Sequence, residues 1–307
     1  MPNHLLVAIV GPTAVGKTAI SIQVAEHFNT EIVSADSRQF YKEMEIGTAK
    51  PSLAEVSKIT HHFINSLSIQ DEYNVGKYEK EALDCIENIF KKHDKVILVG
   101  GSGLFVNAVC HGLDVLPEGD NATREKYEKV LQEQGIEALQ EELKSKDPLY
   151  FEEVDQKNPR RLIRALEVIH ASGLPYSHFR NKKSKVRSFS IAKIGLNIDK
   201  QLLVERINTR IDSMLKAGWL EECKSLYPYR NFNALKTVGY SELFDFIDGK
   251  FDWDTTVEQI KINTWHYAKR QLTWLRKDKE IKWFSPSDRE GIYEYISTFE
   301  SLQDNRV

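Results

Sequence analysis

A glycine-rich loop near the N-terminus constrains this chain more than any other feature. The residues Gly11-Pro12-Thr13-Ala14-Val15-Gly16-Lys17-Thr18 match the pattern G-x-x-x-x-G-K-T. They follow the apolar run Leu5–Val10 and precede the helix-like stretch Ala19–Phe28, which is the strand, loop and helix order of a P-loop. Backbone N–H groups and the helix N-terminus of such a loop bind an oligophosphate. We therefore expect all eight residues at a phosphate site, with Lys17 supplying a charge and Thr18 a hydroxyl ligand for Mg²⁺.

Apolar runs alternate with helical patterns along the rest of the chain. Leu5–Val10, Glu31–Ala35 and Lys95–Val99 have the pattern of buried parallel strands, and Ile191–Ile198 is a fourth. Helical patterns such as Val75–Lys92 lie between them. This alternation predicts an α/β fold in which a P-loop-containing parallel sheet is flanked by helices.

The middle of the chain departs from this alternation. From Pro117 to about Gly173 the pattern is helical and charged, with no convincing strand. We expect a mostly helical insertion domain over residues 116–189, which divides a core formed by residues 1–115 and 190–307. Further helices are expected at Lys200–Ala217, Thr237–Phe246 and Thr256–Lys277.

Composition excludes several classes of protein. Of the 307 residues, 41% are hydrophobic and 28% charged, with a net charge of −3, so a nucleic-acid surface would have to be local. No run approaches the roughly 18 apolar residues of a membrane span, and no signal peptide is evident, which predicts a cytoplasmic protein, taken as a monomer. The three cysteines form no C-x-x-C, so we expect buried thiols without a zinc site.

Two further loops are expected beside the P-loop, because ligands of open parallel sheets lie outside the carboxyl ends of the strands. They are Asp36–Gln39 after the second run and Gly100–Gly103 after the third. An ordinary P-loop NTPase has a metal-binding carboxylate at a strand end, whereas glycines follow Val99. Asp36 is then the main acid of the cleft, which favours transfer to an acceptor held near it. On spacing alone Asp36 is also compatible with a helix N-cap, with Ser37 assisting.

Three basic segments stand out on this net-acidic chain. A helix opening at Pro159 carries Arg160, Arg161 and Arg164 on roughly one side, and the loop Arg180–Arg187 adds five basic residues. In the segment Lys261–Lys282 a basic stripe repeats at seven residues, formed by Lys269, Arg270, Arg276 and Lys277. The positions that should face the core there are Trp265, Ala268, Leu272 and Leu275. Such segments fit a phosphate-backbone footprint or merely solvated helix faces, and both interpretations stay open.

Aromatic residues and histidines add little that is specific. Trp265, Tyr267 and Trp274 have rings that could stack on bases, although core packing is the better interpretation of Trp265. The pair His61-His62 has no third ligand near it in sequence, and adjacent residues point in different directions. We expect His62 to pack or to form hydrogen bonds.

Taken together, these motifs resemble one family over nearly the whole chain. The resemblance rests on Gly11–Thr18, Asp36–Tyr41, Ile46–Pro51, His61-His62, Gly100–Leu104, Arg161–Glu167, Val238–Tyr240 and Lys269–Arg276. In order and spacing these blocks are similar to the tRNA dimethylallyltransferases, the bacterial tRNA isopentenyltransferase family. Small departures are Ser102 where many members have Thr, Phe105 for Tyr and Glu45 for Asp. The zinc finger of eukaryotic members is absent, in agreement with the cysteine count.

The resemblance implies a reaction and its partners. It implies transfer of a dimethylallyl group from dimethylallyl diphosphate to N6 of the adenosine 3′-adjacent to the anticodon, with the tRNA anticodon stem-loop as partner. The implied tRNA contacts are Asp36, Ser37, Arg38, Gln39, Ser102, Arg124, Arg160, Arg161, Leu162, Ile163, Arg164, Lys236, Thr237, Val238, Gly239, Tyr240, Ser241, Lys269, Arg270, Gln271, Leu272, Thr273, Trp274, Leu275 and Arg276.

The chemistry agrees with this implication. The exocyclic adenine amine is a poor nucleophile, so a base must take its proton as it attacks, and Asp36 is the candidate. Thr13 would orient or polarise the reacting groups. The leaving diphosphate calls for Lys17, the loop amides and Mg²⁺ through Thr18, and either Arg206 or Arg210 is a further candidate to reach it.

Three alternatives differ in what they predict. A nucleoside or shikimate-type kinase would use the same loop to phosphorylate its substrate with ATP. An adenylate isopentenyltransferase would use the same donor with a free nucleotide, and would not need the basic segments or the insertion. A non-catalytic RNA-binding module would leave Asp36 and the intact P-loop without a role.

Overall fold

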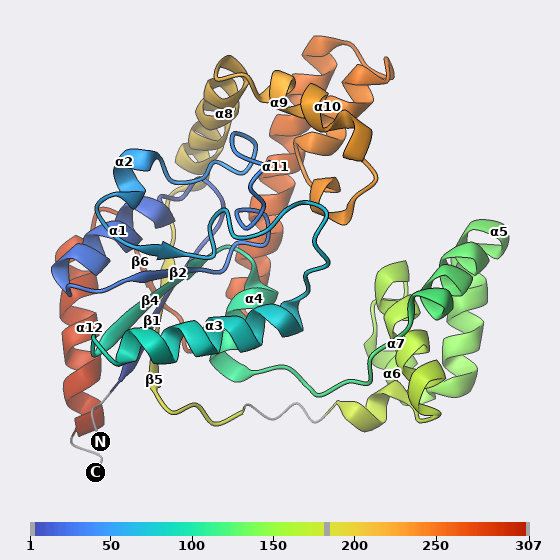
Figure 1. Cartoon of the computed structure of the whole chain (residues 1–307), viewed down its shortest axis with the longest axis horizontal. Coiled ribbons are helices and arrows are strands. Elements are labelled where there is room, and N and C mark those ends of the chain that lie inside the picture. Colours follow the sequence, from blue (N-terminus) through green and yellow to red (C-terminus); the bar gives the residue numbers. More distant parts are fainter. Residues whose placement is uncertain (1–3, 181–184, 305–307) are drawn as a thin grey trace. The chain divides into compact units, whose positions relative to one another are not determined.

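The chain folds into two compact units. In the computed structural model, which describes residues 4–180 and 185–304, one unit comprises Met1–His111 and Val186–Val307, and the other comprises Gly112–Lys185 (Figure 1). The inserted unit thus begins before the expected residue 116 and ends before residue 189. Residues 181–184 of the expected basic loop lie outside the described residues.

The larger unit is built on a six-stranded parallel sheet, which confirms the predicted α/β class. The strand order is β3-β2-β4-β1-β5-β6, and every pair of neighbours is parallel. The strands are β1 (Leu5–Val10), β2 (Ile32–Ser34), β3 (His61–His62), β4 (Lys95–Gly100), β5 (Ser190–Leu196) and β6 (Lys282–Phe284). The two edge strands, β3 and β6, were not expected, because two or three residues carry no period-two pattern to detect.

Both faces of the sheet are buried. Successive side chains of a strand point to opposite faces, so one strand contributes to two separate clusters. Leu5, Val7 and Ile9 of β1 belong to one buried cluster, whereas Leu6, Ala8 and Val10 belong to another. The first cluster includes residues of α1 (Lys17–His27), α8 (Lys200–Lys216), α9 (Trp219–Leu226), α10 (Tyr240–Ile247), α11 (Trp253–Leu275) and α12 (Arg289–Asp304). The second includes residues of α3 (Val75–Phe90) and α4 (Gly103–His111) (Figure 1). The short elements α2 (Leu53–Val56), η2 (Tyr227–Tyr229) and η3 (Asn233–Leu235) lie in connecting segments.

Helix boundaries differ from the expected ones where caps act. The helix expected from Thr237 begins only at Tyr240, because Gly239 has φ +90° and ends the preceding turn. The helix expected from Thr256 begins at Trp253, because the Asp252 side chain accepts a hydrogen bond of 2.8 Å from the Thr255 amide. Caps decide these ends, whereas periodicity locates only the middle of a helix.

The inserted unit is helical and has its own core. It contains α5 (Asn121–Lys146), α6 (Pro148–Glu153), α7 (Pro159–Ser172) and η1 (Tyr176–Phe179). Gly135, at φ 81° and ψ −179°, interrupts α5, so two helical segments fold against each other. The core is formed by apolar side chains that include Tyr127, Leu139, Leu143, Leu162 and Leu166.

Candidate active site

The P-loop adopts a conformation that its residue types allow. Gly16 has φ +107°, a region that side chains rarely adopt. A Cβ at Gly11 would lie 2.8 Å from the carbonyl oxygen of Leu196 on the neighbouring strand β5. The Lys17 ammonium folds back over the loop and donates a 2.8 Å hydrogen bond to the carbonyl of Pro12. The motif thus forms a curled loop directly before α1.

The charges around this loop interact. Burial lowers the pKa of Lys17 to about 8, with Asp36 opposing the shift and Arg210 adding to it. Burial also lowers the pKa of Arg210, again against the attraction of Asp36. Arg206 approaches from the same helix, α8, and donates a 3.1 Å hydrogen bond to the carbonyl of Val15 in the loop. Lys17, Arg210 and Asp36 therefore share an electrostatic environment at the ends of the strands.

A glutamine of α11 joins two of the three predicted loops. Gln271 is only 8% exposed. Its Oε1 accepts a 2.8 Å hydrogen bond from the Thr13 amide, and its Nε2 donates one of 2.9 Å to the Gly101 carbonyl. A Cβ at Gly101 would overlap this Nε2, so a larger residue there would displace the Gln271 amide from its position. Gln271, implied by the resemblance to contact tRNA, is thus bound to the phosphate loop.

Asp36 ends the second strand in a turn. Its Oδ1 accepts a 2.9 Å hydrogen bond from the Arg38 amide, and residues 37–40 form turns with no helix. The helix N-cap interpretation of Asp36 is therefore wrong. Ser37 and Ser102 connect this turn to the third loop, because the Ser37 amide donates to the Ser102 hydroxyl at 3.3 Å and the two hydroxyls are 3.2 Å apart.

These elements surround a pocket lined by both polar and apolar groups. The P-loop and the Asp36 turn supply polar groups, and α8 supplies the Arg210 cation together with apolar side chains. The pocket holds about 730 Å³ of empty space, open solvent at its mouth included. Its lining residues are Thr13, Ala14, Asp36, Arg38, Gly47, Thr48, Ile207, Arg210, Ile211, Met214, Trp219, Thr237, Val238, Thr264 and Tyr267.

Several of these lining residues were not expected from the sequence, and Tyr267 was expected only as a ring that could stack on bases. Burial, together with the Asp36 carboxylate, raises the pKa of Tyr267 to about 12, which keeps the phenol protonated at neutral pH. A signal was present: Thr264, Tyr267 and Gln271 lie at helical spacing on one side of α11. The apolar wall from α8 had no comparable signal, because Ile207, Ile211 and Met214 resemble ordinary core positions.

Comparisons with known proteins identify the family. The family model described as IPP transferase matches residues 39–278. The chain is 49% identical over 297 residues to the tRNA dimethylallyltransferase of Christiangramia forsetii, covering 96% of this chain and 98% of the relative. It is 49% identical to the enzyme of that name from Flavobacterium johnsoniae, covering 95% and 96%. The chain belongs to the tRNA dimethylallyltransferase family.

Solved structures agree with this assignment. The tRNA isopentenylpyrophosphate transferase of Bacillus halodurans is 33% identical, with a TM-score of 0.74 and 98% of each chain covered. A eukaryotic dimethylallyltransferase acting on tRNA is 27% identical, with a TM-score of 0.77 over 92% of this chain and 74% of that one. The predicted fold class, family and enzyme class are confirmed. No helix among the described residues is long and apolar enough to cross a membrane.

The residues of α11 and its C-terminal end for which this family resemblance implied tRNA contact divide by burial. Lys269, Arg270 and Arg276 are exposed, as is Lys277 of the basic stripe, and none of the four forms an ion pair with a carboxylate within the part of the chain that the structure describes. Leu272 and Leu275 are buried in the two apolar clusters of the core. The basic stripe is thus available to a partner, whereas the side chains of the two leucines hold the helix in place. Trp265, expected in the core, is only partly buried and packs against the first cluster.

The arginines of the inserted unit differ in their partners rather than in burial. Arg160 and Arg161 are exposed at the start of α7. Arg164 and Arg124 instead converge on the buried carboxylate of Glu167, at 3.2 and 3.6 Å. The side chains of Leu162 and Ile163 are buried in the core of the unit. Of the residues of this unit that were expected to contact tRNA, Arg160 and Arg161 are therefore the main ones left for that role.

The remaining predictions concern side chains away from the pocket. His62 donates or accepts a 2.6 Å hydrogen bond with Glu31, as expected of a hydrogen-bonding residue. Cys110 and Cys223 are buried free thiols, and Cys85 is half-buried. One cluster in the described chain has metal-ligating side chains, namely His111, Asp278 and Glu280. The Lys193 ammonium lies among them at 2.6 to 2.8 Å, so the cluster already holds a cation.

Proposed function

We propose that this protein transfers the dimethylallyl group of dimethylallyl diphosphate to N6 of the adenosine 3′-adjacent to the anticodon of tRNA, releasing diphosphate, as a cytoplasmic monomer. The observation that carries the proposal is one pocket lined by the Asp36 carboxylate, by cationic groups and by apolar side chains of α8. The cationic groups suit a phosphorylated donor, the carboxylate suits a group that must lose a proton, and the apolar side chains suit an isoprenoid chain. Family membership supports the same reaction.

The donor diphosphate is assigned to the P-loop side. The loop amides, the N-terminus of α1 and Lys17 would bind its oxygens, and Arg210 would neutralise charge that develops on the leaving group. Mg²⁺ fits this side, because the Thr18 hydroxyl has no hydrogen-bonding partner among the described residues and offers the oxygen ligand that the ion prefers. When bound there, Mg²⁺ would neutralise part of the diphosphate charge.

The acceptor adenine is assigned to the Asp36 side. Its exocyclic nitrogen attacks the allylic carbon, the bond between that carbon and the diphosphate oxygen breaks, and Asp36 takes a proton from the nitrogen. Thr13, whose amide is bound by Gln271, would orient the reacting groups. Ile207, Ile211 and Met214 would surround the prenyl chain and exclude water from an allylic carbon with cationic character.

A transfer assay with competing substrates tests the function. Purified protein is incubated with labelled dimethylallyl diphosphate and unmodified tRNA, and digestion of the tRNA should yield a prenylated adenosine. Parallel reactions contain free adenosine monophosphate as acceptor, or ATP as phosphoryl donor. A prenylated free nucleotide or a phosphorylated product, with unmodified tRNA left unchanged, would support the alternative enzymes instead.

The basic stripe of α11 should bind tRNA phosphates. Removing charges from the stripe should weaken tRNA binding and reduce the slope of log affinity against log salt by about one unit per charge at most. The variant Lys269→Ala/Arg276→Ala is titrated with tRNA at several salt concentrations. Affinity for the donor should stay unchanged, since other loops form the diphosphate site.

A matched control separates the stripe from net charge. Lys91 and Lys92 are exposed near the end of α3, and Lys91→Ala/Lys92→Ala removes the same two charges elsewhere. If both double variants lose affinity equally, the stripe is no more than a solvated helix face. The contacts would then have to be sought at Arg160 and Arg161.

A further inference from the structure

A loop without helix or strand forms part of the pocket wall. This segment, residues 45–50, is called the pocket loop, and its residues Gly47 and Thr48 line the pocket. Since no sheet ladder or helix fixes its backbone, its N–H groups need other partners. The position of this part of the wall therefore depends on side chains from elsewhere in the fold.

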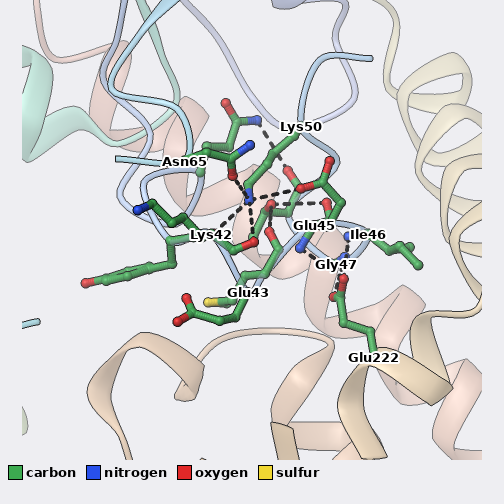
Figure 2. A network of polar contacts seen from close by, with 12 residues as sticks. Lys42, Glu43, Glu45, Ile46, Gly47, Lys50, Asn65 and Glu222 are labelled. Carbon is green, nitrogen blue, oxygen red and sulfur yellow. Dashed lines mark hydrogen bonds and ion pairs between the residues drawn. The ribbon is translucent and has the colours of Figure 1, made fainter. Parts of the chain in front are cut away.

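The carboxylate of Glu222 supplies those partners. Glu222 projects from α9 toward the pocket loop, as Figure 2 shows. Its Oε2 accepts hydrogen bonds from the amides of Glu45 at 2.9 Å and Ile46 at 2.7 Å, and its Oε1 accepts one from Gly47 at 3.0 Å. The Tyr240 hydroxyl donates a fourth, at 2.6 Å. A carboxylate accepts about four such bonds, so this one is saturated.

The far end of the pocket loop is also held. The side chain of Lys50 is only 1% exposed, and burial lowers its pKa while Glu45 opposes the shift. Its ammonium donates to the Tyr41 carbonyl at 2.7 Å and to the side-chain oxygen of Asn65 (Figure 2). Glu222 and Lys50 thus fix the pocket loop at both ends.

The pocket loop is closely packed on both sides. A Cβ at Gly47 would overlap the Trp219 indole and the Tyr240 ring, and Trp219 itself lines the pocket. On the other side, Gln39 lies three residues after Asp36, and its side chain donates a 3.3 Å hydrogen bond to the carbonyl of Thr48. A change in the hydrogen bonds of Glu222 would therefore disturb a part of the pocket wall that contacts the segment following the proposed base.

We propose that Glu222 is a positioning residue for prenyl transfer. By holding the amides of residues 45–47, it sets the distance between the pocket loop and the Asp36 turn, and hence the alignment of the acceptor and the allylic carbon. The inference rests on the proposed function. Misplacement of reacting groups by about 1 Å costs roughly 10²-fold in rate, so the effect should fall on the chemical step.

The test compares two isosteric variants of neighbouring residues. Glu222→Gln keeps the side-chain volume but turns one acceptor into an N–H donor that faces the loop amides. Glu221→Gln is the control: it removes the same charge one residue away, from a side chain that is 68% exposed and paired with Lys224 at 3.6 Å. Single-turnover transfer is measured at saturating donor and tRNA, with tRNA affinity and the thermal midpoint measured separately.

For Glu222→Gln we expect a fall in the single-turnover rate of about 10- to 100-fold, with tRNA affinity within about twofold, and for Glu221→Gln no change. Glu222→Asp keeps an acceptor-only carboxylate and should recover part of the rate. A lower thermal midpoint with an unchanged rate per folded molecule would overturn the proposal. If Glu222→Gln does not fold, Tyr240→Phe, which deletes one of the four donors to Glu222, is measured in its place. An unchanged rate in Tyr240→Phe then overturns the proposal. Absence of transfer by the unaltered protein would refute the proposed function instead.

Discussion

Replacing Asp36 with alanine should lower the single-turnover rate of transfer by about 10²–10⁴-fold while tRNA affinity changes little. Asp36 lies in the pocket at the end of β2, within the electrostatic reach of Lys17 and Arg210. The acceptor amine cannot attack efficiently unless a base removes its proton. The measurement is rapid-quench transfer with enzyme in excess over labelled donor, with tRNA binding followed separately.

A second variant separates chemistry from the shape of the turn. Asp36→Asn preserves an oxygen that can accept the 2.9 Å hydrogen bond from the Arg38 amide, yet an amide cannot act as the base. It should therefore be as slow as Asp36→Ala, although its turn is intact. A near-normal single-turnover rate in Asp36→Asn would falsify the assignment of Asp36 as the base.

Replacing Lys17 with alanine should weaken donor binding and slow transfer, because the proposed mechanism uses this ammonium to neutralise the leaving diphosphate at the P-loop. Full activity of the unaltered protein in excess chelator would, separately, contradict the role given to Mg²⁺ through Thr18. Binding of inorganic diphosphate, measured by calorimetry, isolates the contribution of Lys17 from the acceptor.

The lowered pKa of Lys17 gives this binding a pH dependence with a definite sign. With a pKa of about 8 in the free protein, Lys17 is charged below that pH and loses its proton as the pH rises through it. A bound diphosphate favours the charged form, so affinity should be full near pH 7 and fall by at most about tenfold per pH unit above 8. The pH profile of Lys17→Ala is the baseline, because it contains the titration of the ligand without that of Lys17. Parallel pH profiles in the two proteins would contradict this account.

The sequence located the loops of the site because each depends on local features. A strand that ends in Gly11–Thr18 and runs into a helix has few conformations open to it, and β1 has the bounds that its apolar run predicted. Parallel strands bring their carboxyl ends to one edge of the sheet, which is how Asp36 and the Gly100–Gly103 loop could be expected beside the P-loop. Spacing along α11 likewise separated the exposed basic stripe from the buried leucines.

What the sequence determined by itself was therefore the four inner strands of the sheet, the phosphate loop and the identity of the acid near it. The tertiary structure alone decided which distant side chains hold the loops of the pocket. Gln271 is bound to the amide of Thr13, 258 residues away, and Glu222 to that of Ile46, 176 residues away. Gln271 lies in a motif and at helical spacing with Tyr267, but no such signal identifies the partner of a side chain, because this kind of hydrogen bond depends on how a helix is rotated and placed against the sheet. That placement follows from packing of the whole core.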